Sequence, residues 1–193
     1  MKQDMILAGV GGQGILSIAT VIGSAALEQG LYLKQAEVHG MSQRGGDVQS
    51  NLRLSSEPIH SDLIPRGGAD LIVSLEPMEA LRYLPYLSPT GWIITNTTPF
   101  QNIPDYPEID KVMEALSRVP QVIAIDVDAI AKGIMSHRSA YMVLLGATAA
   151  VLHILDADKL REGIRRVFAR KGAAVVETNL KAFDAGYASA LNR

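Results

Sequence analysis

The sequence predicts an α/β fold: a single doubly wound, mostly parallel sheet with helices on both faces and a small antiparallel excursion near residues 47–64. Two observations predict it. Apolar runs typical of buried parallel strands recur along the chain, at residues 4–9, 70–75, 92–97 and 121–126. Helical or irregular segments separate them. A chain of 193 residues is long enough for one such domain, which we expect to span residues 1–193.

The first elements follow from glycines and apolar spacing. The apolar run at 4–9 ends at a glycine-rich turn, and the next stretch is predicted to be a helix that ends at Gly30. Residues 31–38 then form a second strand. The helix is predicted from apolar residues on a single face, which are Ile15, Ile18, Ala19, Ile22, Ala25 and Ala26.

Alternation predicts the antiparallel excursion. Between residues 47 and 54, apolar Val48, Leu52 and Leu54 fall on one face, and polar Gln49, Asn51 and Arg53 fall on the other. This pattern is typical of a half-exposed antiparallel strand. The stretch "SSEP" indicates a turn, and we expect a return strand at 59–64.

In the second half of the chain we expect a proline-rich loop, then the strand at 121–126, and then helices. Residues 97–107 carry three prolines, so we expect a loop there. From Ser139 onward helices dominate, at 141–155, 158–170 and 175–191.

Composition argues against several classes of function. A net charge of −2 does not favour a nucleic-acid-binding surface, and the longest apolar runs are too short for a membrane span. The amino terminus lacks the features of a secretory signal, so we expect a cytoplasmic protein. With no cysteine, the chain has no ligands for an iron–sulfur cluster, and its four histidines form no close pair that would predict a metal site.

The glycine-rich turn allows more than one use. Gly9, Gly11 and Gly14 fit the G-x-G-x-x-G spacing of dinucleotide sites, in which backbone N–H groups approach a phosphate. Under that interpretation the chain is a free-standing nicotinamide- or flavin-dependent oxidoreductase, and Glu37 would bind a ribose. A tight turn without any ligand fits the same glycines.

The stretch "EVHGMSQRGGDVQSNLR" at 37–53 is a second glycine-rich loop. Arg44 is its candidate functional residue, because a guanidinium binds a phosphate or carboxylate through two parallel hydrogen bonds. A solvated hairpin without a ligand explains the same residues.

Taken together, these motifs resemble the gamma-type subunits of the 2-oxoacid:ferredoxin oxidoreductase family. The resemblance extends along nearly the whole chain, through "GVGGQGI", "HGMSQRGGDVQSNLR", "PIHSDLI", "ADLIVSLEPMEALRYL", "LLGATAA" and "VVETNLKAFDAGY". The phrase "GMSQRGG" and the small size are most similar to the branch that acts on indolepyruvate. One departure is the helix before "LLGA", which commonly begins with Asn in this family and here reads "SHRSAYM", so we assign no site residue there.

The resemblance implies a non-cofactor subunit that is inactive alone. Its larger partner would hold thiamine diphosphate, magnesium and the iron–sulfur clusters, coenzyme A would be the co-substrate, and ferredoxin would take the electrons. Alone, this chain would self-associate through the surface that its partner normally covers. The resemblance assigns Arg44 to an anionic substrate or coenzyme A group, and the residues lining the cleft would be Gly11, Gly12, Gln13, Gly14, Ser42 and Gln43. A purely structural subunit, in which Arg44 pairs with the partner chain, is the alternative.

Overall fold

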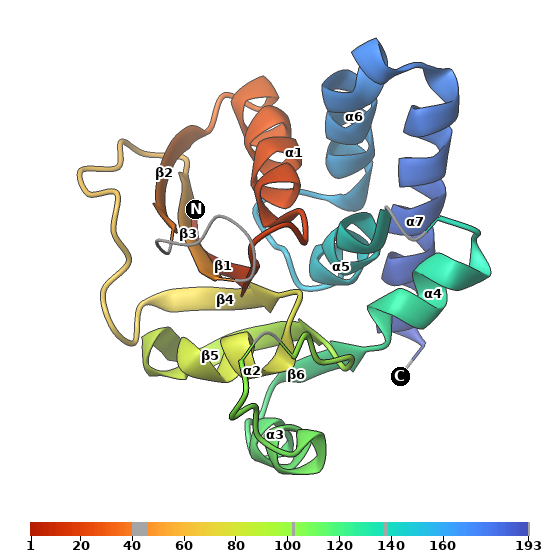
Figure 1. Ribbon diagram of the computed structural model, residues 1–193. Helices are drawn as coiled ribbons and strands as arrows, with labels where there is room; N and C mark the ends of the chain where they lie inside the picture. Colours follow the sequence, from red (N-terminus) through yellow and green to blue (C-terminus); the bar gives the residue numbers. More distant parts are fainter. Residues whose placement is uncertain (40–45, 102, 137–138, 193) are drawn as a thin grey trace.

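The computed structural model describes residues 1–39, 46–101, 103–136 and 139–192, which form a six-stranded sheet in the order β2-β3-β1-β4-β5-β6 (Figure 1). The strands are β1 (Lys2–Val10), β2 (Tyr32–His39), β3 (Asp47–Ser55), β4 (Ala69–Ser74), β5 (Leu87–Asn96) and β6 (Val122–Ile125). Neighbouring strands from β1 through β4 and β5 to β6 are parallel. Strand β3 is antiparallel to both β1 and β2. The predicted mostly parallel α/β class is confirmed.

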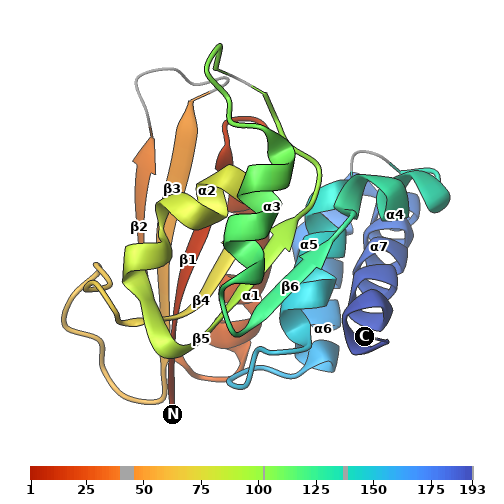
Figure 2. The same ribbon diagram turned by 90° about the horizontal axis from the view of Figure 1, so that it is seen from below.

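Helices cover both faces of the sheet (Figures 1 and 2). The main core lies under α1 (Ile15–Glu28), α4 (Val127–Gly133), α5 (Ala140–Ala149), α6 (Ala157–Phe168) and α7 (Ala173–Leu191). A smaller core on the other face is formed with α2 (Pro77–Arg82), α3 (Ile109–Ser117) and the 3₁₀ turn η1 (Leu84–Tyr86). A second 3₁₀ turn, η3 (Ala169–Lys171), precedes α7. Helices α1 and α2, which follow the adjacent strands β1 and β4, therefore lie on opposite faces.

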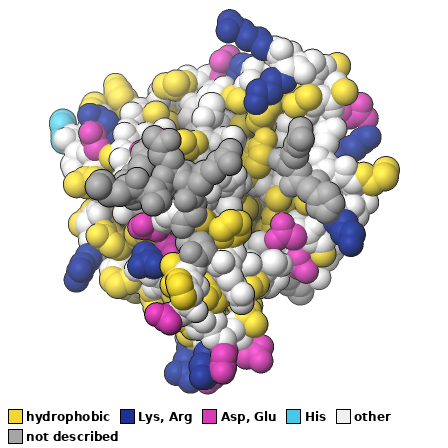
Figure 3. Space-filling view, in the orientation of Figure 1, with side chains coloured by type: hydrophobic (Ala, Val, Ile, Leu, Met, Phe, Trp, Pro, Cys, Tyr) yellow, Lys and Arg dark blue, Asp and Glu magenta, His cyan; other side chains and the backbone are white. Residues whose placement is uncertain are grey.

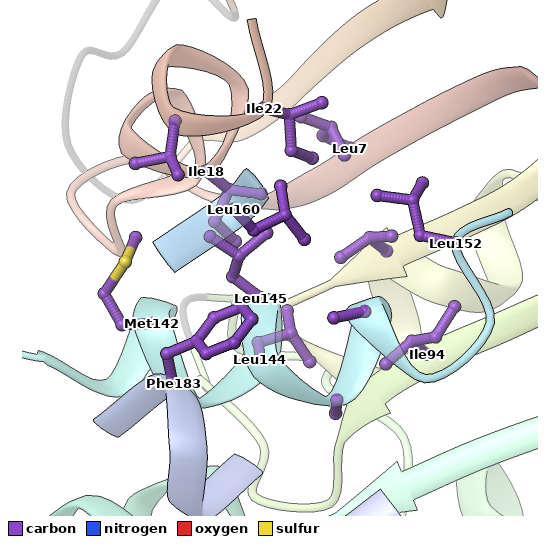
Figure 4. Packing of buried hydrophobic residues seen from close by; sticks show 14 of the residues in the cluster. Leu7, Ile18, Ile22, Ile94, Met142, Leu144, Leu145, Leu152, Leu160 and Phe183 are labelled. Atoms are coloured by element: carbon purple, nitrogen blue, oxygen red, sulfur yellow. The ribbon is translucent and has the colours of Figure 1, made fainter. Parts of the chain in front are cut away.

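The main core packs helix against helix as well as helix against sheet. Figure 4 shows Leu7 of β1 beside Ile18 and Ile22 of α1, with Leu145 of α5 and Phe183 of α7 below them. These side chains are fully buried. The apolar stripe predicted for the first helix is therefore the face that α1 buries.

The prediction of a return strand at 59–64 is wrong, and so is the prediction that β3 is half-exposed. Segment 59–64 is irregular, and side chains on the polar face of β3 bind it by hydrogen bonds. The Arg53 guanidinium donates to the carbonyl oxygens of Ser61 and Leu63, and the Ile64 N–H donates to the Asn51 side chain. Both edges of β3 are already paired, with β1 and β2, so a return strand has no edge of β3 to join, and Asn51 is buried beside the irregular segment instead.

The helix expected at 141–155 is shorter than predicted. Helix α5 ends at Ala149, and the next helix begins at Ala157 with Asp156 as its cap. The buried side chain of Gln3 accepts hydrogen bonds from the N–H groups of His153 and Ile154, which therefore do not continue the helix. The proline-rich loop at 97–107 is confirmed for its described residues.

Candidate functional site

A cleft of about 540 Å³ lies at the carboxyl ends of the parallel strands. Open α/β sheets bind ligands there, where neighbouring strands send their helices to opposite faces. In Figure 2 the turn after β1 and the loop after β5 lie at this end of the molecule, opposite the amino terminus. The residues that line the cleft are Gly12, Gln13, Gly14, Leu75, Asn96, Thr98, Pro99, Phe100, Val127, Asp128, Ala140 and Tyr141.

The glycines of the turn have different roles. Gly12 and Gly14 have φ values of 100° and 96°, in the left-handed region that favours glycine. A Cβ atom at Gly14 would lie 2.7 Å from Cδ1 of Tyr141. At Gly12, by contrast, no described atom lies within 4 Å of the Cβ position. Gly14 therefore permits close packing against α5, whereas Gly12 leaves its backbone open to the cleft.

The amino end of α1 faces this cleft, and no side chain of the described residues caps it. Gly14 is the N-cap residue and has no side chain, so no side-chain hydrogen bond caps the first turn of the described helix, and that turn has no acidic residue. The partial positive charge of a helix amino terminus attracts anions. This wall of the cleft can therefore bind an anionic group through backbone N–H donors.

Two amide side chains connect the strand ends at the floor of the cleft. Gln13 accepts from the Val10 N–H at 2.7 Å and donates to the Leu75 carbonyl at 3.2 Å, which connects the end of β1 to the end of β4. The Asn96 side chain donates to Asp128 at 2.9 Å and accepts from the Val127 N–H at 3.1 Å. Gln13 and Asn96 thus use their polar atoms to hold the floor together.

An aromatic wall and an acidic side chain complete the lining of the cleft. Phe100, on the loop after β5, is 45% exposed and forms this wall. Asp128 adds a negative charge to the lining. Tyr141 is half-buried and packs against Gly14, on the side of the turn, and burial raises its pKa, which keeps its phenol protonated. An elongated ligand would place its anionic end at the turn and an uncharged part against Phe100.

Two buried carboxylates lie next to this wall. Glu76 is 0% exposed, and Glu79 is 1% exposed. Burial raises the pKa of Glu79, although Arg82 opposes the shift by binding both carboxylate oxygens, at 2.8 and 3.1 Å. Glu76 binds backbone and side-chain donors instead, among them the hydroxyl of Tyr106.

The structure brings only some of the predicted residues together. Gly12, Gln13 and Gly14 line the cleft, and Gly11 lies in the same turn, where its N–H donates to the Gly46 carbonyl at 2.9 Å. Ser42, Gln43 and Arg44 lie outside the described residues. Glu37 is on β2, and β3 separates it from β1, so the topology does not place it where the dinucleotide interpretation requires a ribose ligand.

Sequence reasoning missed most of the other lining residues. Asn96 and Thr98 have a recognisable signal, because polar residues directly after a buried apolar strand fall at the carboxyl edge of the sheet. Tyr141 stands near the start of the helix for which no site residue was assigned, and no local pattern distinguishes it from a core aromatic residue. Within the described ranges, no cluster of three or more His, Cys, Asp or Glu side chains could hold a metal ion.

A family model described as pyruvate ferredoxin/flavodoxin oxidoreductase matches residues 4–189. The chain is 34% identical to the indolepyruvate oxidoreductase subunit IorB of Archaeoglobus fulgidus, covering 100% of this chain and 97% of that protein. It is 35% identical to the protein of the same name from Pyrococcus horikoshii, covering 98% and 97%. No helix in the described part of the chain is long and apolar enough to cross a membrane.

Solved structures share the fold over the whole chain. The 2-oxoglutarate:ferredoxin oxidoreductase from Magnetococcus marinus, with 2-oxoglutarate, coenzyme A and succinyl-CoA bound, aligns with a TM-score of 0.78 and 25% identity, covering 100% of this chain and 31% of that chain. The keto/oxoacid ferredoxin oxidoreductase gamma subunit from Geobacter sulfurreducens aligns with a TM-score of 0.71 and 22% identity, covering 99% of each chain.

Proposed function

This chain belongs to the pyruvate ferredoxin/flavodoxin oxidoreductase family, and on that premise we propose that it is the small, non-cofactor subunit of a 2-oxoacid:ferredoxin oxidoreductase acting on indolepyruvate or another arylpyruvate. The observation that carries this proposal is the full-length similarity to proteins named as indolepyruvate oxidoreductase subunits. The larger subunit would hold thiamine diphosphate, magnesium and the iron–sulfur clusters.

The assembled enzyme would cleave the bond between the carboxylate and the oxo carbon of the substrate. Carbon dioxide would leave, the acyl group would replace the proton on the sulfur of coenzyme A, and the two electrons released would reduce ferredoxin. Thiamine diphosphate supplies the carbanion chemistry when it is bound in the partner. The residues of this chain would bind and orient the substrates at the interface with that partner.

The cleft is the part of this chain suited to such a role. The amino end of α1 offers backbone donors to a carboxylate or phosphate, and the Phe100 wall offers contact area to an uncharged part of the same molecule. We assign the lining of the substrate approach to Gly11, Gly12, Gln13 and Gly14 together with Ser42 and Gln43, and contact with an anionic group to Arg44.

We expect the purified chain alone to show no visible chromophore and no turnover of a 2-oxoacid. The reason is that the sequence contains no cysteine ligand for a cluster. Absorbance spectra and assays with indolepyruvate, coenzyme A and an artificial electron acceptor test this, with the co-expressed pair of subunits as the positive control. Bound flavin in the lone chain, or turnover without the partner, would contradict the subunit assignment.

Replacing Arg44 with lysine is expected to lower kcat/KM of the assembled enzyme by roughly tenfold to a hundredfold, the size expected when a charge-assisted hydrogen bond is lost from a bound substrate. Lysine keeps the charge but does not reproduce the planar, two-pronged geometry of a guanidinium. The measurement is kcat/KM for the 2-oxoacid and for coenzyme A.

Varying the subunit concentration separates this role from a structural one. If Arg44 pairs with the partner chain, the activity of Arg44→Ala returns at high subunit concentration, because mass action restores assembly. Wild-type kinetics in both the Lys and the Ala variants would remove Arg44 from the functional site.

A further inference from the structure

Glu76 is a buried carboxylate that binds groups from two parts of the chain. Its Oε2 accepts from the Glu79 N–H at 2.8 Å and thereby caps the first turn of α2. Its Oε1 accepts from the hydroxyl of Tyr106 and from the Phe100 N–H, the latter at 3.4 Å. Because Glu76 is 0% exposed, water does not replace these donors, and without the Tyr106 hydroxyl Oε1 keeps the long bond from the Phe100 N–H.

The two donors to Oε1 lie near opposite ends of the proline-rich segment 97–107. Pro99, Pro104 and Pro107 have no N–H group, so these positions cannot donate to a neighbouring strand. Burial, and after it the hydrogen bond to Glu76, raises the pKa of Tyr106, so its phenol remains a donor at neutral pH. Figure 2 shows the segment leaving the end of β5 and leading into α3.

The same segment forms a wall of the cleft. Thr98, Pro99 and Phe100 line the cleft. The N–H of Phe100 donates to Glu76, so this hydrogen bond holds the backbone that carries the Phe100 ring. Thr98 is held separately, through its N–H to Asn96 at 3.2 Å and its hydroxyl to Asp126 at 3.4 Å. Glu76 and Tyr106 therefore hold this wall at Phe100. Asn96 and Asp126 hold it at Thr98, next to the end of β5. Figure 3 looks onto this end of the molecule, where hydrophobic side chains reach the surface between charged ones.

We propose that Glu76 and Tyr106 are positioning residues that hold Phe100 in place as the contact surface for the uncharged part of a substrate bound in the cleft. Neither Glu76 nor Tyr106 is among the residues that line the cleft. Their hydrogen bond fixes the backbone of the segment before the substrate arrives, so that binding does not have to order it. The inference rests on the proposed function, because it takes the cleft as the site for an arylpyruvate or coenzyme A.

Tyr106→Phe is the test variant, since it removes one hydroxyl and keeps the ring. In the co-expressed complex we expect amide hydrogen exchange of the peptide covering 97–107 to become roughly tenfold faster or more. Tyr86→Phe is the matched control: Tyr86, half-buried like Tyr106, packs against the small core around α2 and α3, and the change likewise removes one hydroxyl and keeps the ring. Equal exchange in the two variants would overturn the proposal.

The role in binding needs a second measurement. Added indolepyruvate or coenzyme A is expected to slow exchange of the 97–107 peptide in the wild-type complex, and Tyr106→Phe is expected to raise the ligand concentration for half-protection roughly tenfold. KM should rise by the same factor for the protecting ligand, with kcat changed less than about twofold. Phe100→Ala should reproduce the rise in KM while leaving Tyr106 bound to Glu76.

Failure of this inference is distinguishable from failure of the proposed function. Absence of turnover in the wild-type complex would overturn the oxidoreductase assignment, whereas the exchange measurement needs no turnover. No protection by either ligand in wild type, or unchanged half-protection and KM in Tyr106→Phe, would overturn the positioning role even in an active enzyme.

Discussion

Replacing Gly146 with alanine is expected to lower the free energy of unfolding by about 3 kcal/mol or more, at the upper end of the cost of overpacking a core. Gly146 of α5 faces α7 so closely that a Cβ atom would lie 1.9 Å from the Phe183 carbonyl oxygen. The contact is reciprocal, because a Cβ at Gly186 would lie 1.9 Å from the Val143 carbonyl oxygen. Both obstacles are backbone atoms, so relief requires the two helices to move apart.

Moving the helices apart disturbs the main core, since Leu144, Leu145 and Phe183 are fully buried beside this crossing (Figure 4). In a domain of this size, 3 kcal/mol corresponds to a fall in Tm of roughly 6 °C or more. Thermal unfolding of the full chain, followed by circular dichroism, measures it.

Gly133→Ala is the matched control for this substitution. Gly133 is also helical, in α4, but no described atom lies within 4 Å of its Cβ position. We expect its Tm to stay within about 2 °C of wild type or to rise, because alanine reduces the conformational entropy of the unfolded chain. A Gly146→Ala protein as stable as the Gly133→Ala protein would show that α5 and α7 are not in close contact.

The sequence was sufficient to predict the strands and the first turn because their causes are local. Apolar runs at 70–75, 92–97 and 121–126 correspond closely to β4, the end of β5 and β6. The strand, glycine turn and apolar stripe at the start of the chain likewise predicted β1 and α1. Hydrophobic periodicity and glycine conformations act within a few residues, so they can be interpreted without knowing the fold.

The predictions that were wrong depend on contacts between distant residues. Gln3, far away in sequence, binds the N–H groups of residues 153 and 154, so the helix predicted to reach residue 155 does not include them. Segment 59–64 finds no free edge on β3, which pairs with β1 and β2, and the side chains of Arg53 and Asn51 bind its backbone groups instead. No periodicity in these segments indicates which side chain from elsewhere will bind their backbone.

The residues of the candidate site also divide into those that a local pattern predicts and those that only the fold brings together. Gln13 and its neighbouring glycines were predicted from a local strand-turn-helix pattern, and they line the cleft. Phe100 and Tyr141 join the cleft from the loop after β5 and from the start of α5, which only the folded sheet brings together. Glu76 shows the same limit: "SLEPMEAL" indicates a helix start, but its hydrogen bond to Tyr106 spans 30 residues.

Arg53→Ala is expected to destabilise the protein by about 3–5 kcal/mol, the cost of leaving a buried charge without its partner. Arg53 binds both oxygens of Asp4, with Nε to Oδ1 at 2.9 Å and Nη2 to Oδ2 at 3.0 Å. Asp4 is 0% exposed, in the middle of the sheet on β1. Without the guanidinium, Asp4 still pairs with Lys2 at 2.8 Å. The Lys2 side chain is 57% exposed, so water screens this ion pair.

The same substitution also frees segment 59–64, because Nη1 of Arg53 donates to the carbonyl oxygens of Ser61 and Leu63 at 2.9 and 3.0 Å.

Urea unfolding of Arg53→Ala, Asp4→Asn and the double variant forms a double-mutant cycle. Arg53→Ala leaves Asp4 with the exposed Lys2, and Asp4→Asn leaves Arg53 without its carboxylate, so we expect the double variant to lose less stability than the sum of the two. Arg118→Ala is the control, since Arg118 pairs with Glu114 on the surface, with side chains 75% and 63% exposed, and should cost less than about 1 kcal/mol. Equal losses for Arg53→Ala and Arg118→Ala, or strict additivity in the cycle, would show that the Asp4–Arg53 pair does not hold β1, β3 and segment 59–64 together.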